Sequence, residues 1–262
     1  MNIREFRAID FLKKVGEAYG NLYLGFSGGK DSIVTYDLAR RAGISFTAQY
    51  GNTTLDPPGV IKFIRDHYPD VQIIHPVESF CKLVERKGLP TRQTRWCCEH
   101  LKEYIGIGKN TIQGVRAAES KNRTGRDYIQ CDNRKVMKGA QHIYPIYDWS
   151  DEEIWEYIRE YNLPVPDAYE KGCVRIGCVG CVLTSIPKRK FEFRLFPRYY
   201  DMIKRAIDKG MSNNPQWKLT VACDGDAETA MQWWLSNRSI NQYFKDYTFE
   251  KINNIWTKTK KE

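Results

Sequence analysis

The sequence predicts an α/β fold, in which a doubly wound, mostly parallel sheet precedes a mainly helical C-terminal part. Short apolar runs typical of strands alternate with segments of helical periodicity between residues 22 and 161. This alternation is typical of parallel sheets. Glycine-rich and polar segments follow the apolar runs, at the sheet edge where such folds bind ligands. We expect one domain over residues 1–185 and a second, basic and aromatic, over residues 186–262.

Helices and strands are expected in a regular order. The expected strands cover residues 22–26, 44–50, 71–75, 111–115 and 142–147. The expected helices cover residues 3–19, 31–42, 60–67, 79–87, 151–161 and 226–235. Ser150 and Glu153 form a capping box that opens the helix of residues 151–161. The tail of residues 258–262 is expected to be disordered.

The composition argues against some classes of protein. No apolar run approaches the ~18 residues of a membrane span, and the charged N-terminus lacks the apolar stretch of a signal peptide. We therefore expect a cytoplasmic protein with no membrane partner. A net charge of +9 with sixteen Tyr and seven Trp favours a nucleic-acid partner. A generally basic surface, or one that only attracts nucleotides, explains the charge equally well.

The stretch that ends the first expected strand combines the features of an anion-binding site. The apolar run of residues 22–26 stops at a turn with two glycines, and a helix begins close to Asp31. The N–H groups of such a turn converge on one point, and the helix dipole adds partial positive charge there. Lys30 supplies a full charge, and two serines supply hydroxyl donors.

This loop, Ser-Gly-Gly-Lys-Asp-Ser, resembles that of the PP-loop ATP pyrophosphatases, which have adenine nucleotide alpha hydrolase-like folds. It differs from the common P-loop because Lys30 is followed by Asp31 rather than by Ser or Thr. The resemblance implies that ATP is split between its α and β phosphates, with Mg²⁺ neutralising charge. The alternative is an ordinary glycine-rich turn. The residues expected to bind ATP in this loop are Ser27, Gly28, Gly29, Lys30, Asp31 and Ser32.

Polar residues also follow the second expected strand. The resemblance places an Asp-Thr-Gly-like segment beside the nucleotide at this point, where this chain has Asn52, Thr53 and a further threonine. We expect Asn52 and Thr53 to bind the nucleotide, although the different motif makes the adenosine role a loose transfer. The alternative is a capped loop, with Thr54 or Asp56 capping the next helix.

An arginine follows the fourth expected strand. Arg116 is placed to grip a phosphate, and Glu119 is available to hold it in position. The alternative is a solvated, charged loop. We expect Lys30, Asp31 and Arg116 to act in catalysis, with Lys30 and Arg116 stabilising charge at the α-phosphate.

Eight cysteines in a chain expected to be cytoplasmic favour metal or redox chemistry over structural disulfides. The tandem pair Cys97-Cys98 and the C-x-x-C pair Cys178 and Cys181 can supply four sulfurs. A tandem pair makes awkward zinc ligands, whereas each sulfur of a [4Fe–4S] cluster binds a different iron. Cys173 could substitute for one of them, because its spacing to Cys178 is similar to that of plant-type ferredoxins. Zinc and reduced buried thiols remain alternatives.

Five motifs in one order resemble the phosphoadenylyl-sulfate (PAPS) reductase family in its iron–sulfur branch. They are Ser-Gly-Gly-Lys-Asp-Ser, Cys-Cys, Gly-Val-Arg-x-x-Glu-Ser, Pro-Ile-x-x-Trp-x-x-x-x-x-Trp and C-x-x-C, over about residues 20–185. The resemblance implies that Cys97, Cys98, Cys178 and Cys181 hold a [4Fe–4S] cluster.

The chain departs from the reductases at their C-terminal Glu-Cys-Gly-Leu-His segment, whose thiolate attacks the sulfonucleotide before thioredoxin releases sulfite. This sequence has no such segment, and its last cysteine, Cys223, lacks the motif. The family also includes the ATP pyrophosphatase subunit of DNA phosphorothioation systems, and iron–sulfur transfer-RNA thiolases share the loop. We therefore expect adenylylation of an acceptor for sulfur insertion into nucleic acid, with DNA favoured over RNA. A sulfonucleotide reductase with a divergent or borrowed thiol, and a non-catalytic nucleotide-sensing subunit, are the alternatives.

The C-terminal part is expected to hold the nucleic acid. Residues 188–209 carry eight basic and three acidic residues with interleaved aromatics, a pattern of single-strand binding. An amphipathic helix packed on the core explains the pattern at least as well. A cysteine desulfurase or another sulfur donor is the second expected partner, and we also consider a homodimer.

Overall fold

The computed structural model describes residues 2–20, 22–120, 123–133 and 139–261, and the chain forms two compact units. Unit 1 takes residues 1–52, 56–75 and 102–177, and unit 2 takes residues 53–55, 76–101 and 178–262. The domain boundary expected at residue 185 divides the chain in sequence order. In the structure, residues 76–101 and 178–185 pack with the C-terminal part instead.

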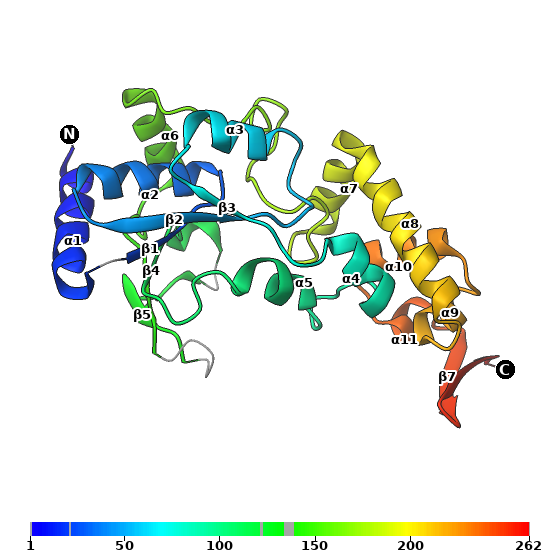
Figure 1. The fold of residues 1–262 in the computed structure, drawn as a ribbon. Coiled ribbons are helices and arrows are strands. Elements are labelled where there is room, and N and C mark those ends of the chain that lie inside the picture. The colour runs from blue at the N-terminus through cyan, green and yellow to red at the C-terminus, as the bar shows by residue number, and fades with distance from the viewer. Residues whose placement is uncertain (1, 21, 121–122, 134–138, 262) are drawn as a thin grey trace. The chain divides into compact units, whose positions relative to one another are not determined.

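Unit 1 is built on a six-stranded sheet with the order β3-β2-β1-β4-β6-β5 (Figure 1). The strands are β1 (Leu22–Gly25), β2 (Phe46–Gly51), β3 (Gln72–Ile74), β4 (Thr111–Gln113), β5 (Ile129–Cys131) and β6 (Gln141–Ile143). Neighbouring strands are parallel except for the edge strand β5, which runs antiparallel to β6. The predicted mostly parallel α/β sheet is therefore confirmed. The strand order reverses between β1 and β4, where open sheets of this kind bind ligands.

Helices pack against this sheet. They are α1 (Ile3–Tyr19), α2 (Lys30–Arg41), α3 (Val60–His67) and α6 (Asp151–Glu160), with the short 3₁₀ turn η2 (Ala117–Glu119). Helix α2 packs against both α1 and α6, and its residues Ile33, Val34 and Leu38 are fully buried. The capping box of α6 is confirmed, because the Ser150 hydroxyl accepts from the Glu153 N–H at 3.2 Å and the Glu153 carboxylate accepts from the Ser150 N–H at 2.7 Å.

Helix α3 begins differently from the prediction. Its N-cap is Gly59, whose φ of +90° lies in the left-handed region that favours glycine. The Thr54 hydroxyl instead accepts a hydrogen bond from the Phe80 N–H at 2.9 Å within unit 2. The expectation that Thr54 or Asp56 caps this helix is therefore wrong.

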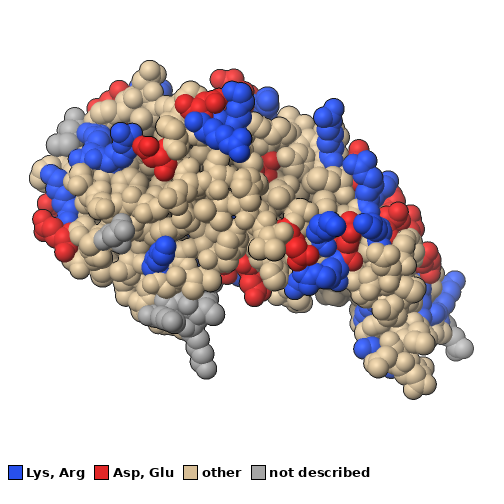
Figure 2. Space-filling model, viewed as in Figure 1, with Lys and Arg blue, Asp and Glu red and all other residues tan. Residues whose placement is uncertain are grey.

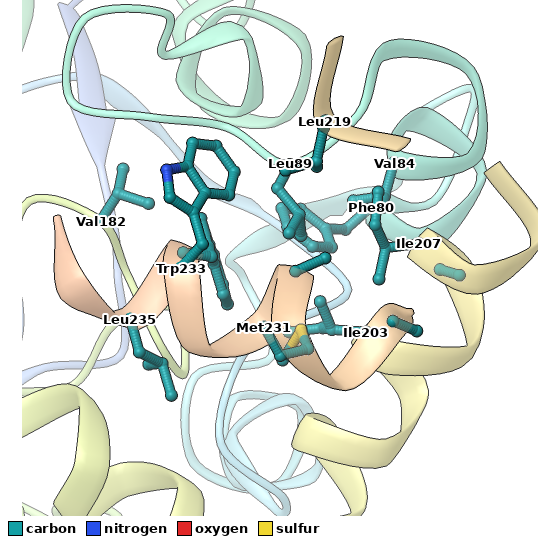
Figure 3. Packing of buried hydrophobic residues seen from close by; sticks show 14 of the residues in the cluster. Phe80, Val84, Leu89, Val182, Ile203, Ile207, Leu219, Met231, Trp233 and Leu235 are labelled. Atoms are coloured by element: carbon teal, nitrogen blue, oxygen red, sulfur yellow. The ribbon is translucent and has the colours of Figure 1, made fainter. Parts of the chain in front are cut away.

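Unit 2 is mainly helical. Its elements are α4 (Phe80–Lys87), α5 (Trp96–Cys98), the π-helical turn η1 (Glu99–Glu103) that leads back to unit 1, α7 (Ile186–Leu195), α8 (Pro197–Asn213), α9 (Lys218–Ala222), α10 (Ala227–Ser236), α11 (Ile240–Tyr243), β7 (Tyr247–Ile252) and β8 (Ile255–Lys260). Figure 3 shows its core, in which Phe80 and Val84 of α4 meet Ile203 and Ile207 of α8 and Met231 of α10. This apolar burial is what holds the helices of the unit together.

The C-terminal end of the described chain is a hairpin. Strands β7 and β8 pair antiparallel, and the turn residues Asn253 and Asn254 have φ of 51° and 65°. Two positive φ values in a row are typical of a type I′ turn, which asparagine tolerates. The expectation that residues 258–262 are disordered is therefore wrong for Lys258 to Lys260, which belong to β8. Among the described residues, no helix has both the length and the apolar character that a bilayer span requires.

Candidate functional site

The loop between β1 and α2 is held by its own serines. The Ser32 hydroxyl oxygen accepts hydrogen bonds from the Ser27 N–H and the Ser27 hydroxyl, both at 3.1 Å, and donates to the Gly29 carbonyl at 2.8 Å. Gly28 has a φ of +71°, and a Cβ there would lie 3.2 Å from Val60. The loop is thus fixed at the N-terminus of α2, where the helix dipole favours an anion.

Two buried cations lie beside this loop. Lys30 and Arg116 are each 3% exposed. The Lys30 Nζ lies 3.1 Å from Asp151 Oδ1 and 3.4 Å from Asp31 Oδ2. The Arg116 guanidinium places Nε 2.6 Å from Asp31 Oδ1 and Nη2 2.8 Å from Asp151 Oδ1, and it donates to the Trp149 carbonyl. Lys30, Asp31, Arg116 and Asp151 therefore form one charged cluster, called here the loop cluster.

The structure brings the predicted catalytic residues Lys30, Asp31 and Arg116 together, and adds Asp151 to them. Asp151 is the first residue of α6. An acidic residue at this position is common because it interacts favourably with the helix dipole, so the sequence gives no separate sign of a role in the site. Its side chain is 47% exposed, so it is the member of the loop cluster that solvent reaches most easily. Burial alone would raise the pKa of Asp151, but hydrogen bonds and charge from Lys30 and then Arg116 hold it below its usual range.

Glu119 does not hold the Arg116 side chain, so this expectation is corrected. The turn η2 folds the Glu119 carboxylate back onto the chain, where it accepts from the Arg116 backbone N–H at 3.2 Å. The carboxylate also pairs with Arg123 and lies 3.5 Å from Arg175. Glu119 therefore fixes the backbone at Arg116, and two aspartates orient the guanidinium.

Tyr169 is a second residue that sequence analysis missed. Its hydroxyl accepts a hydrogen bond from the Lys30 N–H at 2.8 Å, and a Cβ on Gly29 would lie 3.3 Å from the same oxygen. Burial raises the pKa of Tyr169, which therefore stays protonated at neutral pH. Trp155 packs edge-on against its ring, with centroids 5.1 Å apart. The contact spans 139 residues, so local sequence carries no signal for it.

Gly114 allows the end of β4 to approach the first turn of α2. A Cβ at this position would lie 2.6 Å from the Asp31 carbonyl oxygen and 3.0 Å from the Ser32 nitrogen. Both are backbone atoms that cannot swing away. The glycine of the Gly-Val-Arg motif therefore brings Arg116 within reach of Asp31.

A cavity of about 190 Å³ lies next to this loop, at the carboxyl ends of β1, β2 and β4. The residues that line it are Tyr23, Gly25, Phe26, Ser27, Gln49, Tyr50, Gly51, Asp56, Lys102, Ile105, Thr111, Gln113 and Gly177. Its walls combine aromatic rings with amide and hydroxyl groups, as small-molecule sites commonly do.

Asn52 and Thr53 fall on either side of a unit boundary. Asn52 belongs to unit 1, where its side-chain amide lies 3.0 Å from His75 Nδ1. Thr53 belongs to unit 2, is fully buried, and accepts from the Leu55 N–H through its hydroxyl. Neither residue lines the cavity, so their expected contact with the nucleotide stays a prediction.

The four cysteines expected to bind a cluster all belong to unit 2. Cys97 and Cys178 are half-buried against the core of the unit, and the stacked Phe80 and Trp96 rings hold α5 on α4. A hydrogen bond with Cys98, burial, and the charges of Cys98, Cys178 and Cys181 raise the pKa of Cys97 well above its ordinary value. The four thiols are therefore electrostatic neighbours.

Among the described residues, no group of three or more Cys, His, Asp or Glu side chains is arranged to hold one metal ion. Sulfurs around a single zinc stand within about 4 Å of one another, because each Zn–S bond is about 2.3 Å. The thiolates of a [4Fe–4S] cluster bind separate irons and stand further apart. As a donor type, four neighbouring thiols are compatible with an iron–sulfur cluster.

The other cysteines have different surroundings. Cys173 is buried and belongs to unit 1, whereas the four thiols belong to unit 2. Cys223 is 3% exposed, and burial raises the pKa of its thiol to about 12. A thiol of this kind is a poor nucleophile, because the thiolate is the reactive form.

The aromatic residues of the basic segment mostly face the core. Phe193 is buried against Trp234, and Phe196, Tyr199 and Tyr200 pack on the same core. The interpretation as a packed amphipathic helix therefore accounts for these rings. Of the basic residues of this segment, Arg189 is buried, and the others are exposed or partly exposed. Figure 2 shows Lys and Arg side chains along the ridge of α8, with Asp and Glu beside them.

Unit 2 also contains a cavity of about 250 Å³ between the loop after α4 and the end of α10. Its walls include Arg92, Arg238 and the rings of Trp233 and Trp234, and none of its lining residues is acidic. A cavity with these walls favours an anionic ligand.

Comparisons with known proteins agree with this fold and loop. The model of the phosphoadenosine phosphosulfate reductase domain matches residues 21–184. An uncharacterized protein of Methanocaldococcus jannaschii is 31% identical over 78% of this chain and 45% of its own length. A second uncharacterized protein of that organism is 30% identical over 77% of this chain and 53% of its own. The chain thus spans about half the length of these two relatives.

A reductase and a solved structure are also similar. The adenosine 5′-phosphosulfate reductase of Allochromatium vinosum is 27% identical over 68% of this chain and 74% of its own length. The crystal structure of phosphoadenylyl-sulfate reductase from Candida auris in a phosphate complex has a TM-score of 0.51 at 18% identity. It covers 65% of this chain and 87% of its own, which supports the fold alone. By its sequence from residue 21 to residue 184, the chain belongs to the phosphoadenosine phosphosulfate reductase domain family.

Proposed function

We propose that this protein is an ATP pyrophosphatase that adenylylates an acceptor so that sulfur can be inserted into nucleic acid, as in DNA phosphorothioation. The observation that carries the proposal is the loop cluster. Lys30 and Arg116 are buried cations whose positions are set by Asp31 and Asp151, beside a serine–glycine loop at a helix N-terminus. Such an arrangement is suited to the negative charge of a triphosphate.

The chemistry follows from these positions. Attack of an acceptor oxygen on the α-phosphorus of ATP forms a new P–O bond and breaks the bond to pyrophosphate, which leaves with the electron pair. The loop of residues 27–32 would hold the departing pyrophosphate, and Lys30 and Arg116 would stabilise charge at the α-phosphate. A sulfur nucleophile then bonds to the acceptor atom, and the bond from that atom to its adenylylated oxygen breaks. The oxygen leaves with the electron pair as part of AMP, which is a good leaving group.

Two groups would assist this reaction. Mg²⁺ prefers oxygen ligands, and the carboxylates of Asp31 and Asp151 are the donors available in the loop cluster. A [4Fe–4S] cluster on Cys97, Cys98, Cys178 and Cys181 would supply sulfur or electrons, and a cysteine desulfurase could supply persulfide sulfur instead. The residues of the chain would bind and orient both groups.

The acceptor is proposed to be a polyanion. The net charge of +9 and the cavity lined by Arg92, Arg238 and two tryptophans support nucleic acid as the partner. DNA is our first choice and RNA the second.

The experiment measures pyrophosphate release from Mg-ATP by anaerobically purified protein, with and without DNA or RNA. We expect release that nucleic acid stimulates and that Lys30→Ala abolishes. Lys14→Ala is the control, because Lys14 is an exposed lysine of α1 that pairs with Asp10. Absence of release with every nucleic acid, or release that survives Lys30→Ala, would contradict the proposal.

A second candidate function is reduction of a sulfonucleotide to sulfite with thioredoxin. Several relatives are named adenosine 5′-phosphosulfate reductases, which favours this candidate. Against it, Cys223, the only cysteine that follows the Cys178–Cys181 loop, is buried with a raised thiol pKa. Formation of sulfite from adenylyl sulfate and thioredoxin, without pyrophosphate release from ATP, would establish the reductase instead.

A further inference from the structure

Unit 2 contains a fully buried arginine. Arg189 of α7 is 0% exposed and is among the largest fully buried side chains of the described residues. Its Nε donates to the Gly180 carbonyl at 3.2 Å, and its Nη1 donates to the Trp234 carbonyl at 2.9 Å and to Asn237 Oδ1 at 3.0 Å. Its guanidinium also lies 4.2 Å from the centroid of the Trp234 ring.

The charge of Arg189 is not balanced by these contacts. Each of its hydrogen-bond acceptors is a neutral oxygen, and its buried Nη2 has no partner among the described residues. Burial lowers the pKa of Arg189 to about 10, so the group is still charged at neutral pH. The charge of the buried Glu192, one turn further along α7, favours the charged form of Arg189, but no salt bridge joins the two side chains among the described residues. A buried charge without a hydrogen-bonded counter-ion is costly, and buried charges in native proteins are normally paired. The folded protein is therefore expected to hold an anion close to Arg189.

The hydrogen bond from Arg189 to the Gly180 carbonyl connects this arginine with the cysteine loop. Gly180 is the third residue of the Cys178-Val-Gly-Cys181 loop, so the bond from Arg189 ends one residue before Cys181.

A second residue of α7 binds the same glycine. Glu192 Oε2 accepts from the Gly180 N–H at 2.8 Å, so Arg189 and Glu192 bind both polar groups of this residue. Gly180 has a φ of +73°, and a Cβ there would lie 2.2 Å from the Phe193 ring. No other residue fits this position without movement of α7. The conformation of the cysteine loop is therefore set by one turn of α7.

A second arginine binds the segment after Cys181. Arg92 donates through Nε to the Val182 carbonyl and through Nη2 to the Thr184 carbonyl, both at 3.0 Å. Two guanidinium groups thus hold the backbone on the C-terminal side of the loop.

We infer that Arg189 positions the loop of Cys178 and Cys181 and balances the charge of the group bound there. The anion that would pair with Arg189 is an iron–sulfur cluster together with its thiolate ligands. The four thiolates outweigh the positive charge of a [4Fe–4S] core, so the bound group is a net anion. The inference rests on the cluster of the proposed function. Removal of a nearby positive charge should lower the reduction potential of the cluster, because the reduced form carries more negative charge.

The test compares three variants of the anaerobically purified full chain: Arg189→Gln, Arg189→Lys and Arg194→Gln. Arg194 lies on the same helix with an exposed side chain, so it is the matched control. Iron and acid-labile sulfide content, the midpoint potential from a redox titration, and the rate of cluster loss to a chelator are measured, with circular dichroism as the check of folding.

We expect Arg189→Gln to lower the midpoint potential and to lose its cluster roughly 10-fold faster than the wild type. Arg189→Lys keeps the charge but not the fork of donors, so its potential should stay near the wild-type value while its cluster is lost faster. If Arg189→Gln does not fold, the rate of cluster loss from Arg189→Lys alone tests the inference. Arg194→Gln should match the wild type in every measurement.

Equal potentials and loss rates for Arg189→Gln and Arg194→Gln would overturn the inference, as would equal shifts for the Gln and Lys variants. A wild-type protein that holds no iron after anaerobic purification and reconstitution would overturn it too. That last result would remove the cluster from the proposed function but leave the ATP reaction intact, because pyrophosphate release is measured separately.

Discussion

Arg116 Nε and Asp31 Oδ1 lie 2.6 Å apart, and this ion pair joins the end of β4 to the first turn of α2. The same arginine reaches Asp151 at the start of α6, so one guanidinium fixes the positions of three segments. An ion pair buried to this extent is sensitive to the loss of either partner. The geometry of the loop cluster therefore depends on the planar fork of Arg116 rather than on its charge alone.

The first prediction concerns this fork. Arg116→Lys keeps the charge but cannot reach Asp31, Asp151 and the Trp149 carbonyl together. We expect kcat/KM for pyrophosphate release to fall by roughly 10²-fold, as for the loss of one preorganised donor at a reacting phosphate. Arg40→Lys, on the exposed side of α2, is the control. A rate close to that of the wild type would show that charge alone suffices at this position.

The second prediction concerns Gly114. A methyl group at this position would meet the Asp31 carbonyl oxygen at 2.6 Å, so Gly114→Ala must push β4 and α2 apart. We expect a loss of about 1–3 kcal/mol in the free energy of unfolding, typical of overpacking. Gly25→Ala is the matched control, because its Cβ would find its nearest atoms at 3.9 Å. Urea unfolding measures both; equal stability of the two variants would contradict the prediction.

The third prediction concerns the reactivity of Cys223. Its thiol is buried with a pKa raised to about 12, so iodoacetamide should not alkylate it in the folded protein at pH 8. Cys131 is exposed and should be alkylated under the same conditions. Peptide mass spectrometry before and after denaturation measures both residues. Alkylation of Cys223 at the rate of Cys131 in the native state would restore it as a candidate nucleophile for a reductase.

The fourth prediction concerns acid stability. Hydrogen bonds from Tyr200 and then from Gln232 and Lys204 lower the pKa of Glu228 from 4.5 to about 2. A group whose folded-state pKa is lowered stabilises the fold above its unfolded pKa, and this stabilisation is lost as the pH falls from about 4.5 towards 2. The difference in unfolding free energy between the wild type and Glu228→Gln should therefore shrink across this range.

Urea unfolding followed by tryptophan fluorescence between pH 2 and 7 checks the prediction for Glu228, with wild type and variant measured side by side. The effect should be small, because the Glu228 side chain is 44% exposed and water screens its ion pair with Lys204. A difference that stays constant with pH would mean that Glu228 acts through packing rather than through its charge.

The sheet and the loop could be predicted from local sequence. Apolar runs of residues 22–26, 44–50 and 111–115 overlap β1, β2 and β4, although the strands are shorter, because the ladder ends where the chain turns into its loops. The loop residues and Arg116 were predicted at the ends of these strands, where parallel strands place their ligands. These features are local, so periodicity and glycine positions were enough to predict them.

The partners of the loop could not be predicted in this way. Tyr169 and Asp151 each contact Lys30 although more than a hundred residues separate them from it in the sequence. Local sequence explains Tyr169 as a packed aromatic ring and Asp151 as an acidic residue at a helix N-terminus. The edge strand β5 is three residues long and carries too little pattern to identify. The hairpin of β7 and β8 was missed because its charged faces resemble a solvated tail, although two adjacent asparagines mark the turn.

The division of unit 2 into three chain segments has a consequence for the order in which the protein is made. Cys97 and Cys98 belong to the same unit as Cys178 and Cys181, which lie beyond residue 177, after the last segment of unit 1. At about 5–20 residues per second, the ribosome needs several seconds or more to reach Cys178 after it has passed Cys98. During that interval the loop of Cys178 and Cys181 and the helix that follows it have not been synthesised. Cys97 and Cys98 are therefore exposed to oxygen, metal ions and chaperones before Cys178 and Cys181 exist.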